Sequence, residues 1–284
     1  MTAPHGLVSG VIPFSAVDGP GNRVVVFLQG CNFDCVACHN PHTIAVCDHC
    51  GLCLDACANG ALALGGGVVR WDQAACAGCD RCLAACPRNS TPKAGWRSVA
   101  ELVALVRGPA PFLSGVTVSG GEATLQTPFV RAFFEALQGD ARLGRLTRFV
   151  DSNGAAPAHV WDALEPLMDG AMIDLKAFDD DAHRRLTGQS NELVLDAIER
   201  LAACGKLHEV RLLMMPGWND APEQLARAAA WLRGVDPGVR VKLIGFRRHG
   251  VRPAARSLPE PSAESMAGYV DVLCSEGLTR LLVV

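Results

Sequence analysis

The segment VVVFLQGCNFDCVACHNP, Val24–Pro41, joins a run of apolar and β-branched residues directly to three closely spaced cysteines. The run Val24–Gln29 is typical of a buried parallel strand. Cys31, Cys35 and Cys38 follow at CxxxCxxC spacing, just beyond the point where that strand would end. In (β/α) barrels the chemistry collects at the carboxyl ends of the strands. The segment therefore predicts a barrel-type α/β fold with a thiolate site at a strand end.

A site with three thiolates has a specific use. A [4Fe–4S] cluster held by Cys31, Cys35 and Cys38 leaves one iron without a protein ligand, which is useful only if a small molecule binds there. The alternative is a zinc site completed by His39 or His42. The rest of the chain favours the cluster.

Similar apolar runs recur along the chain, at Gly115–Ser119, Thr147–Asp151, Ala171–Lys176, Glu209–Met215 and Val239–Phe246. Helical patterns separate most of them, at Ser98–Arg107, Thr127–Gln138, Ala158–Met168, Asn191–Cys204 and Ala221–Arg233. A further helix is expected at Ser262–Gly277 and a last strand at Thr279–Val284. This alternation predicts a parallel α/β sheet, which we assign to a partial (β/α)6 TIM-like barrel.

Each predicted strand ends in a distinctive motif. After the cysteine loop come SGGEAT, DSNG, DLKAFDD, MMPGWND and FRRHG, in that order along the chain. Such motifs at six strand ends indicate a functional barrel rather than a purely structural one.

The composition limits the classes of function. The 284 residues are 49% hydrophobic and 19% charged, so the chain can bury a sizeable core. A net charge of -3 argues against a nucleic-acid binder that works through a basic face. No apolar run approaches the roughly 20 residues needed to span a membrane, and the first residues do not resemble a signal peptide. We expect a cytoplasmic protein that binds neither nucleic acid nor membrane.

Thirteen cysteines in such a protein are unlikely to form disulfides. Cys204 and Cys274 stand apart and are expected to be buried small apolar residues. Eight others form two CxxCxxCxxxC runs, a spacing typical of bacterial ferredoxins, in which the fourth cysteine ligates the other cluster. The two predicted [4Fe–4S] ligand sets are Cys47, Cys50, Cys53 and Cys86 for one cluster, and Cys57, Cys76, Cys79 and Cys82 for the other.

These runs interrupt the first strand–helix connection. We expect residues 44–94 to form a ferredoxin-like insertion with a small hairpin at Leu62–Trp71, and residues 1–43 and 95–284 to form the barrel. The alternative of two zinc sites is disfavoured, because zinc sites usually pair two-cysteine knuckles.

The joint order of these motifs resembles the radical S-adenosylmethionine (SAM) enzymes, over nearly the whole chain. CxxxCxxC after the first strand and GGE after the second carry the resemblance. FSAVDGPGNRVVVFLQGCNFDC, SGGEATLQ, DSNG and DLKAF look like the glycyl radical enzyme activating enzymes, a large subset of which has a ferredoxin-like insertion. LPEP and RRHGVR look most like the YjjW-type subgroup.

The resemblance implies an activity. The open iron of the cluster would chelate SAM, and an electron from the cluster would cleave SAM to a 5′-deoxyadenosyl radical. In this family that radical removes hydrogen from a glycine Cα of a partner glycyl radical enzyme. The implied cofactors are three [4Fe–4S] clusters and SAM, with a monovalent cation in some relatives, and the expected reductant is a flavodoxin or ferredoxin.

The resemblance also implies site residues. Gly120 and Gly121 would admit the SAM ammonium to backbone carbonyls, with Glu122 orienting their loop. Backbone contacts to adenine are expected from Ala37 and His39. Further expected SAM contacts are Asp151 and Asn153 near the ribose and sulfonium, and Lys176 on the carboxylate; Asp174 and Asp151 resemble residues that hold the cation.

The chain departs from the family at one position. Relatives usually place a histidine after the aromatic residue of the sixth strand, whereas Arg247 follows Phe246 here. Arg247 either takes over a polar contact to adenosine or leaves that contact absent. Asp18 and Arg23 match a loop that holds the partner or orders a turn, and His183 matches a family pattern or is a helix-face histidine.

Other functions remain to be distinguished. A peptide or cofactor maturase of the radical SAM type is the first alternative, but such enzymes often carry extra clusters at the C-terminus. A non-enzymatic electron carrier would need none of the strand-end motifs. The insertion's clusters would relay electrons or act as structural props and docking surface, and both roles fit the sequence.

Overall fold

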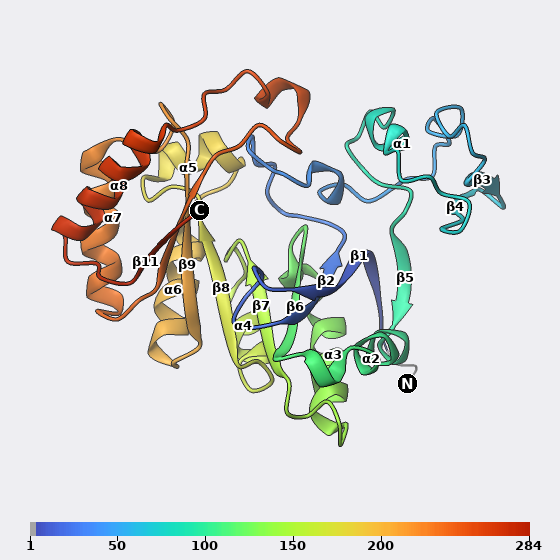
Figure 1. Cartoon of the computed structure of the whole chain (residues 1–284), viewed down its shortest axis with the longest axis horizontal. Coiled ribbons are helices and arrows are strands. Elements are labelled where there is room, and N and C mark those ends of the chain that lie inside the picture. Colours follow the sequence, from blue (N-terminus) through green and yellow to red (C-terminus); the bar gives the residue numbers. More distant parts are fainter. Residues whose placement is uncertain (1–3) are drawn as a thin grey trace.

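The computed structural model describes residues 4–284 and is organised around one sheet of nine strands, in the order β11-β10-β9-β8-β7-β6-β2-β1-β5 (Figure 1). The strands from β2 to β11 in this order are parallel to their neighbours. They span Arg23–Leu28 (β2), Gly115–Gly120 (β6), Thr147–Ser152 (β7), Gly170–Leu175 (β8), Leu207–Met214 (β9), Val241–Gly245 (β10) and Leu281–Val283 (β11). The six strands predicted for the barrel and the last strand are confirmed.

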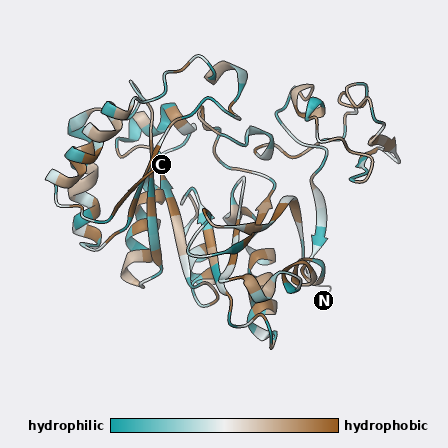
Figure 2. Cartoon of the chain, in the orientation of Figure 1, coloured by the Kyte–Doolittle hydropathy of each residue, from teal (hydrophilic) through white to brown (hydrophobic). Residues whose placement is uncertain are grey.

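Helices follow most of these strands, as predicted. The longer ones are α2 (Val99–Arg107), α3 (Thr127–Gly139), α4 (Ala158–Leu164), α5 (Asp180–Thr187), α6 (Glu192–Ala203), α7 (Pro222–Val235) and α8 (Ala263–Ser275). Shorter helical turns are α1 (Arg81–Ala84), η1 (Pro41–Thr43), η2 (Ala110–Phe112), η3 (Ala123–Gln126) and η4 (Pro253–Ala255). Figure 2 shows both apolar and hydrophilic residues on the helices, as expected for helices that pack one face on a sheet.

Local sequence explains where these elements begin and what they bury. Ser98 and Glu101 form a capping box that starts α2. In α3 the apolar residues recur with helical spacing and bury Phe129, Val130, Phe133, Phe134 and Leu137. Strand β2 is covered on both faces, with Val24, Val25, Val26 and Leu28 at most 1% exposed. Burial on both faces is typical of a parallel sheet between helices.

Two antiparallel strands extend the sheet beyond β2 and were not predicted. β1 (His5–Ser15) pairs with β2, and β5 (Gly95–Ser98) pairs with β1. The chain leaves the sheet after β2 and rejoins it at β5, so the cysteine-rich segment lies between two strands of the same sheet edge (Figure 1).

The cysteine-rich segment contains the predicted hairpin, β3 (Leu62–Gly65) paired with β4 (Val68–Trp71). Gly66 and Gly67 both have positive φ, the conformation that tight hairpin turns require. Beneath the hairpin lies a small apolar cluster of Cys53, Leu62, Val69 and Cys82. The expectation for the two isolated cysteines is not met: Cys204 is half-buried and Cys274 is exposed on α8.

Within residues 4–284, no helix has the length and apolar character needed to span a membrane.

Candidate active site

A cavity of about 370 Å³ lies at the carboxyl ends of the parallel strands. Residues from the ends of β2, β6, β7, β8, β9 and β10 contribute to its lining. The predicted site residues that line it are Cys31, Cys35, Ala37, Cys38, His39, Gly120, Gly121, Glu122, Asp151, Asn153, Asp174 and Lys176. The structure thus brings together residues that are up to 145 positions apart in the sequence.

The three-cysteine loop is held by backbone hydrogen bonds at both ends. The amides of Gly30 and Cys31 donate to Thr43 O (2.8 Å) and Ile44 O (3.0 Å). Further along the loop, the amides of Asp34 and Val36 donate to carbonyl oxygens of α5 at 2.9 Å. Anchoring on both sides fixes the three sulfurs relative to the strand ends.

Burial raises the pKa of the Cys31 thiol to about 12 and that of Cys35 to about 11. These thiols are therefore protonated in the metal-free chain at neutral pH. Because metals bind thiolates, occupation of the site would release protons. The Cys31 sulfur also has two nearby donors, the Phe33 amide at 3.4 Å and the Asn153 amide nitrogen Nδ2 at 3.8 Å.

The zinc alternative required His39 or His42. The Nε2 atom of His39 lies 3.0 Å from Arg247 O, so the ring contacts the segment that follows β10. His42 does not line the cavity. Among residues 4–284, no three His, Cys, Asp or Glu side chains are arranged to hold a single metal ion.

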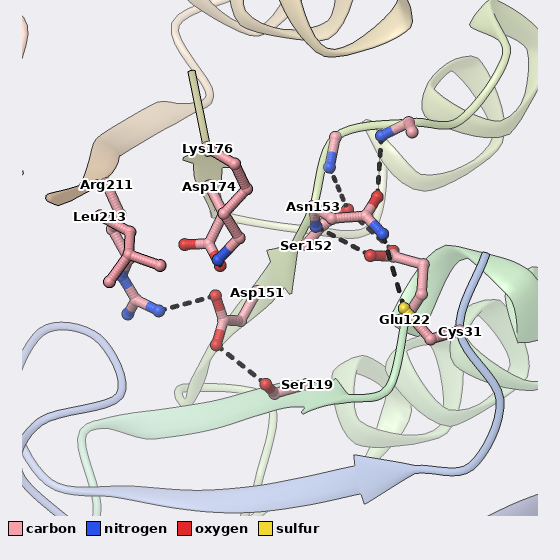
Figure 3. A network of polar contacts seen from close by, with 12 residues as sticks. Cys31, Ser119, Glu122, Asp151, Ser152, Asn153, Asp174, Lys176, Arg211 and Leu213 are labelled. Carbon is pink, nitrogen blue, oxygen red and sulfur yellow. Dashed lines mark hydrogen bonds and ion pairs between the residues drawn. The ribbon is translucent and has the colours of Figure 1, made fainter. Parts of the chain in front are cut away.

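Glu122 is 1% exposed and organises the strand ends around it. Its Oε1 accepts hydrogen bonds from Thr124 N (2.9 Å), Thr124 Oγ1 (2.7 Å) and Ser152 Oγ (2.8 Å), and its Oε2 accepts from Asn153 N (2.8 Å) (Figure 3). Burial raises the pKa of this carboxyl, although the four donors oppose the rise. Its donors are the protein's own groups, which supports the predicted role of orienting the loop.

The two glycines before Glu122 are required by close packing. A Cβ at Gly120 would lie 2.1 Å from Leu28 N, and a Cβ at Gly121 would lie 2.2 Å from Gly30 O. These contacts are with backbone atoms, which cannot turn aside as a flexible side chain can. Because Gly120 and Gly121 have no side chains, the end of β6 can approach the cysteine loop closely. This packing role is separate from any contact that the two glycines make with a ligand.

Four charged side chains alternate across β7, β8 and β9 (Figure 3). Arg211 donates to Asp151 at 2.8 Å, and Lys176 donates to Asp174 at 2.7 Å. Asp151 also accepts from Ser119 Oγ at 2.8 Å. Arg211 was missed in the sequence, although a charged residue at alternate positions of an apolar strand, as in EVRLL, is a usable signal for an inward-facing polar group.

These charges support one another. Burial alone would lower the pKa of Lys176, but the neighbouring Asp174 carboxylate outweighs it and the net shift is upward. Burial would raise the pKa of Asp174, but Lys176 and Arg211 outweigh it and hold that pKa below its ordinary value. Lys176 and Asp174 are therefore both charged at neutral pH, with the ammonium beside the three cysteines.

Of the other candidates, Asp18 lines the cavity, whereas Arg247 and Arg23 do not. Arg247 is exposed and does not line the cavity, because β10 ends at Gly245 and the chain turns outward after buried Phe246. Asp18 does line the cavity. Arg23 is fully buried and donates to Thr117 Oγ1, Pro20 O and Val116 O, so it orders its turn.

His183 is buried on α5. Its ring packs edge-on against Phe33 of the cysteine loop, with centroids 5.4 Å apart. Its Nδ1 lies 2.8 Å from Gln189 O, which is the contact of a structural histidine that supports the loop.

Two smaller cavities lie in the cysteine-rich segment. One is lined by Cys57, Cys76, Cys79 and Cys82, and the other by Cys47, Cys50, Cys53 and Cys86. Each cavity combines three cysteines of one run with the fourth cysteine of the other run. This is the exchange that the ferredoxin spacing predicts.

Donors point toward these cysteine sulfurs. The amides of His49, Gly78 and Ser90 lie 3.4–3.5 Å from Cys47, Cys76 and Cys86 respectively. Trp71 lines the first of the two cavities, and hydrogen bonds from the Gly78 amide and the Trp71 indole both lower the pKa of Cys76. An indole donor beside four cysteines fits a group with acceptor sulfurs.

Comparisons with known proteins agree with this site. Residues 25–229 match the family described as the Radical SAM superfamily. The isethionate sulfite-lyase activating enzyme of Desulfovibrio desulfuricans is 30% identical, covering 87% of this chain and 85% of that protein. The (2S)-3-sulfopropanediol sulfolyase activating enzyme of Bilophila wadsworthia is 31% identical, with 78% of each chain covered. The pyruvate formate-lyase-activating enzyme of Streptococcus mutans is 27% identical, covering 86% and 79%.

Solved structures show the same fold. QueE from Escherichia coli has a TM-score of 0.55 at 11% identity, over 99% of this chain and 94% of that chain. A domain of the pyruvate-formate lyase-activating enzyme from Bacteroides vulgatus has a TM-score of 0.50 at 24% identity, over 60% of this chain and 99% of that chain.

The packing at Gly121 generates a prediction. We expect Gly121→Ala to destabilise the fold by about 1–3 kcal/mol, because the added Cβ meets two backbone carbonyl oxygens. This corresponds to a fall of roughly 2–10 °C in the melting temperature measured by thermal unfolding. Gly234→Ala is the matched control, since a Cβ there meets nothing within 4 Å on α7. Equal melting temperatures for the two variants would contradict the packing argument.

Proposed function

Because the chain belongs to the radical SAM superfamily, and within it to the activating enzymes of glycyl radical enzymes, we propose that it generates a glycyl radical on a partner enzyme. The observation that carries the proposal is the shared cavity. It is lined by the three cysteines, the GGE loop and Lys176, which come from three different strand ends.

The bound [4Fe–4S] cluster and SAM supply the chemistry: an electron cleaves SAM to methionine and a 5′-deoxyadenosyl radical, which takes a hydrogen atom from the partner's glycine Cα and becomes 5′-deoxyadenosine. Cys31, Cys35 and Cys38 would hold the cluster. Lys176 would pair with the SAM carboxylate, and its raised pKa keeps it charged for that contact. The chain's own part is to bind and orient these groups and to limit water around them.

The remaining contacts are assigned by position in the cavity. Gly120 and Gly121 would accept the SAM ammonium, while Ala37 and His39 would meet adenine through their backbones. Asp151 and Asn153 would lie near the ribose and the sulfonium. Arg247 is the weakest member of the set, because it lies outside the lining. A monovalent cation between Asp151 and Asp174 stays a prediction, and each carboxylate already has a cationic side chain beside it.

We further propose that residues 44–94 form an insertion with two [4Fe–4S] clusters, and that residues 1–43 and 95–284 form the partial barrel. The cysteine lining of the two small cavities and the donors near their sulfurs, the Trp71 indole among them, support this. Such clusters can reach strongly negative potentials, so they suit a relay from a flavodoxin or ferredoxin.

The substrate would be a glycine because its Cα can be approached closely. Without a Cβ, the partner's glycine loop can enter the cavity and present its Cα to the radical. Asp18, on the loop before β2, lines the cavity and would meet an entering loop there. Its carboxylate accepts from Ser15 Oγ at 2.5 Å, which fixes its direction.

The proposed function is tested by anaerobic incubation with SAM, a reductant and glycyl radical enzymes encoded beside this gene. We expect an organic radical signal on the partner, with a doublet that collapses when the glycine α-hydrogen is replaced by deuterium. Air should then cleave the partner at that glycine. If SAM is turned over while every candidate partner stays free of radical, another substrate replaces the glycine.

The cluster assignment predicts about 12 iron atoms per chain after anaerobic reconstitution. Replacing Cys31, Cys35 and Cys38 together with Ala should leave about eight iron atoms and abolish reductive SAM cleavage. Iron analysis and 5′-deoxyadenosine formation measure the two effects. Wild-type amounts of 5′-deoxyadenosine from the triple variant would refute the assignment, and about four iron with zinc in the remaining sites would refute the insertion clusters.

Lys176→Ala should weaken SAM binding. Truncating one partner of a buried charge pair costs about 2–5 kcal/mol, so the dissociation constant should rise by roughly 30-fold or more. Titration with SAM measures this, and Lys206→Ala is the control, since Lys206 bonds Met168 O at the opposite ends of the strands. Unchanged SAM affinity in Lys176→Ala would assign Lys176 a purely structural role.

A further inference from the structure

A segment of the chain after the last barrel strand packs on the cysteine loop. Residues 247–262, here called the strap, connect β10 to α8 and pass the blue cysteine loop near the top of Figure 1. A Cβ at Gly250 would lie only 2.9 Å from His39 O, so the two backbones approach closely. Gly250 also has φ of +80°, a conformation that favours glycine.

The strap is held down by an apolar underside. Val251 and Ala255 are at most 3% exposed and pack in one cluster with Ala37 of the cysteine loop and with Phe246. This burial places Arg252, which directly follows Val251, at a defined position against the loop.

The Arg252 guanidinium points toward the cysteine loop. Its Nη2 donates to the carboxylate of Asp34, the residue directly before Cys35. The Arg252 side chain is 21% exposed, whereas that of Asp34 is 70% exposed. Arg252 does not line the cavity, so it contacts the cysteine loop from outside the predicted SAM site.

The guanidinium lies close to two of the three cysteines along the chain. Its partner Asp34 directly precedes Cys35, and the strap meets the loop again at His39, which directly follows Cys38. Lys176 reaches the loop from inside the cavity, so Arg252 supplies a second cation from the outer side. A positive charge near a cluster stabilises the reduced cluster, which carries one more electron, and so makes the reduction potential less negative.

We propose that Arg252 is a positioning residue that fixes the cysteine loop through Asp34 and makes the reduction potential of the cluster on Cys31, Cys35 and Cys38 less negative. The inference rests on the proposed function only in that these cysteines hold a [4Fe–4S] cluster. It needs no partner enzyme and no turnover.

The two members of the ion pair allow a sharp test, because removing their charges has opposite electrostatic effects. Arg252→Gln should shift the midpoint potential to a more negative value, and Asp34→Asn should shift it to a less negative value. Arg252→Lys should stay close to the wild type. Arg256→Gln is the matched control, an exposed arginine on the same strap, and should leave the potential unchanged.

The potentials are read by electron paramagnetic resonance during a redox titration, following the one signal that changes when SAM is added. Iron is determined on each variant, and about 12 atoms per chain should remain. Shifts of opposite sign at full iron content support the proposal. Shifts of the same sign, unchanged potentials, or loss of about four iron atoms in both Arg252→Gln and Asp34→Asn would overturn the electrostatic role.

Failure of this inference differs from failure of the proposed function. If the wild type holds no SAM-responsive cluster, the proposed function fails. If it holds that cluster and the Arg252 and Asp34 variants behave alike, only the inference fails.

Discussion

One buried carboxylate holds the ends of three neighbouring strands together. The Glu122 side chain accepts hydrogen bonds from the end of β7, while its own amide donates to Gly30 O beyond the end of β2 at 2.7 Å. A buried carboxylate is costly unless its oxygens are satisfied, and four donors satisfy these. Because Gly30 directly precedes Cys31, the position of the first cysteine depends on the Glu122 backbone, which the side chain holds in place. Glu122 therefore sets the geometry of the site without needing to touch a ligand.

The charges across β7, β8 and β9 obey the same constraint. Asp151 and Asp174 both face the cavity, and two buried carboxylates so placed would repel each other. Arg211 and Lys176 compensate them, each at hydrogen-bond distance. Glu209 gives Arg211 a second carboxylate at 3.0 Å. Of these four charged side chains, Lys176 lies nearest the cysteines. The site therefore offers a fixed positive charge where an anionic group of a ligand can be held.

The sequence predicts much of this arrangement because strand periodicity, turn residues and cysteine spacing are local signals. β2 and the hairpin at Gly66 and Gly67 belong to this class. β1 was missed because its glycines and Pro13 interrupt the alternation, and its pairing with β5 depends on residues about 90 positions away. α5 was missed because it has only eight residues and is mostly polar, although its buried residues recur with helical spacing and Asp179 and Gly188 mark its two ends. Whether a side chain such as Arg247 faces the cavity depends on where a strand ends, which local patterns do not define.

Hydrogen bonds tie both ends of the cysteine-rich segment to the end of β2. Gln29, at the end of β2, donates to His42 O (2.8 Å) and Ala45 O (2.6 Å), and Ser90 donates to the same Ala45 carbonyl at 2.8 Å. The neighbouring Ile44 carbonyl accepts from the Cys31 amide. The start of the segment at Ala45 and its end at Ser90 are thus hydrogen-bonded to each other and to Gln29, next to the backbone that positions Cys31. A movement of the cysteine-rich segment would strain the three-cysteine loop, so the position of that segment is coupled to the geometry of the cavity.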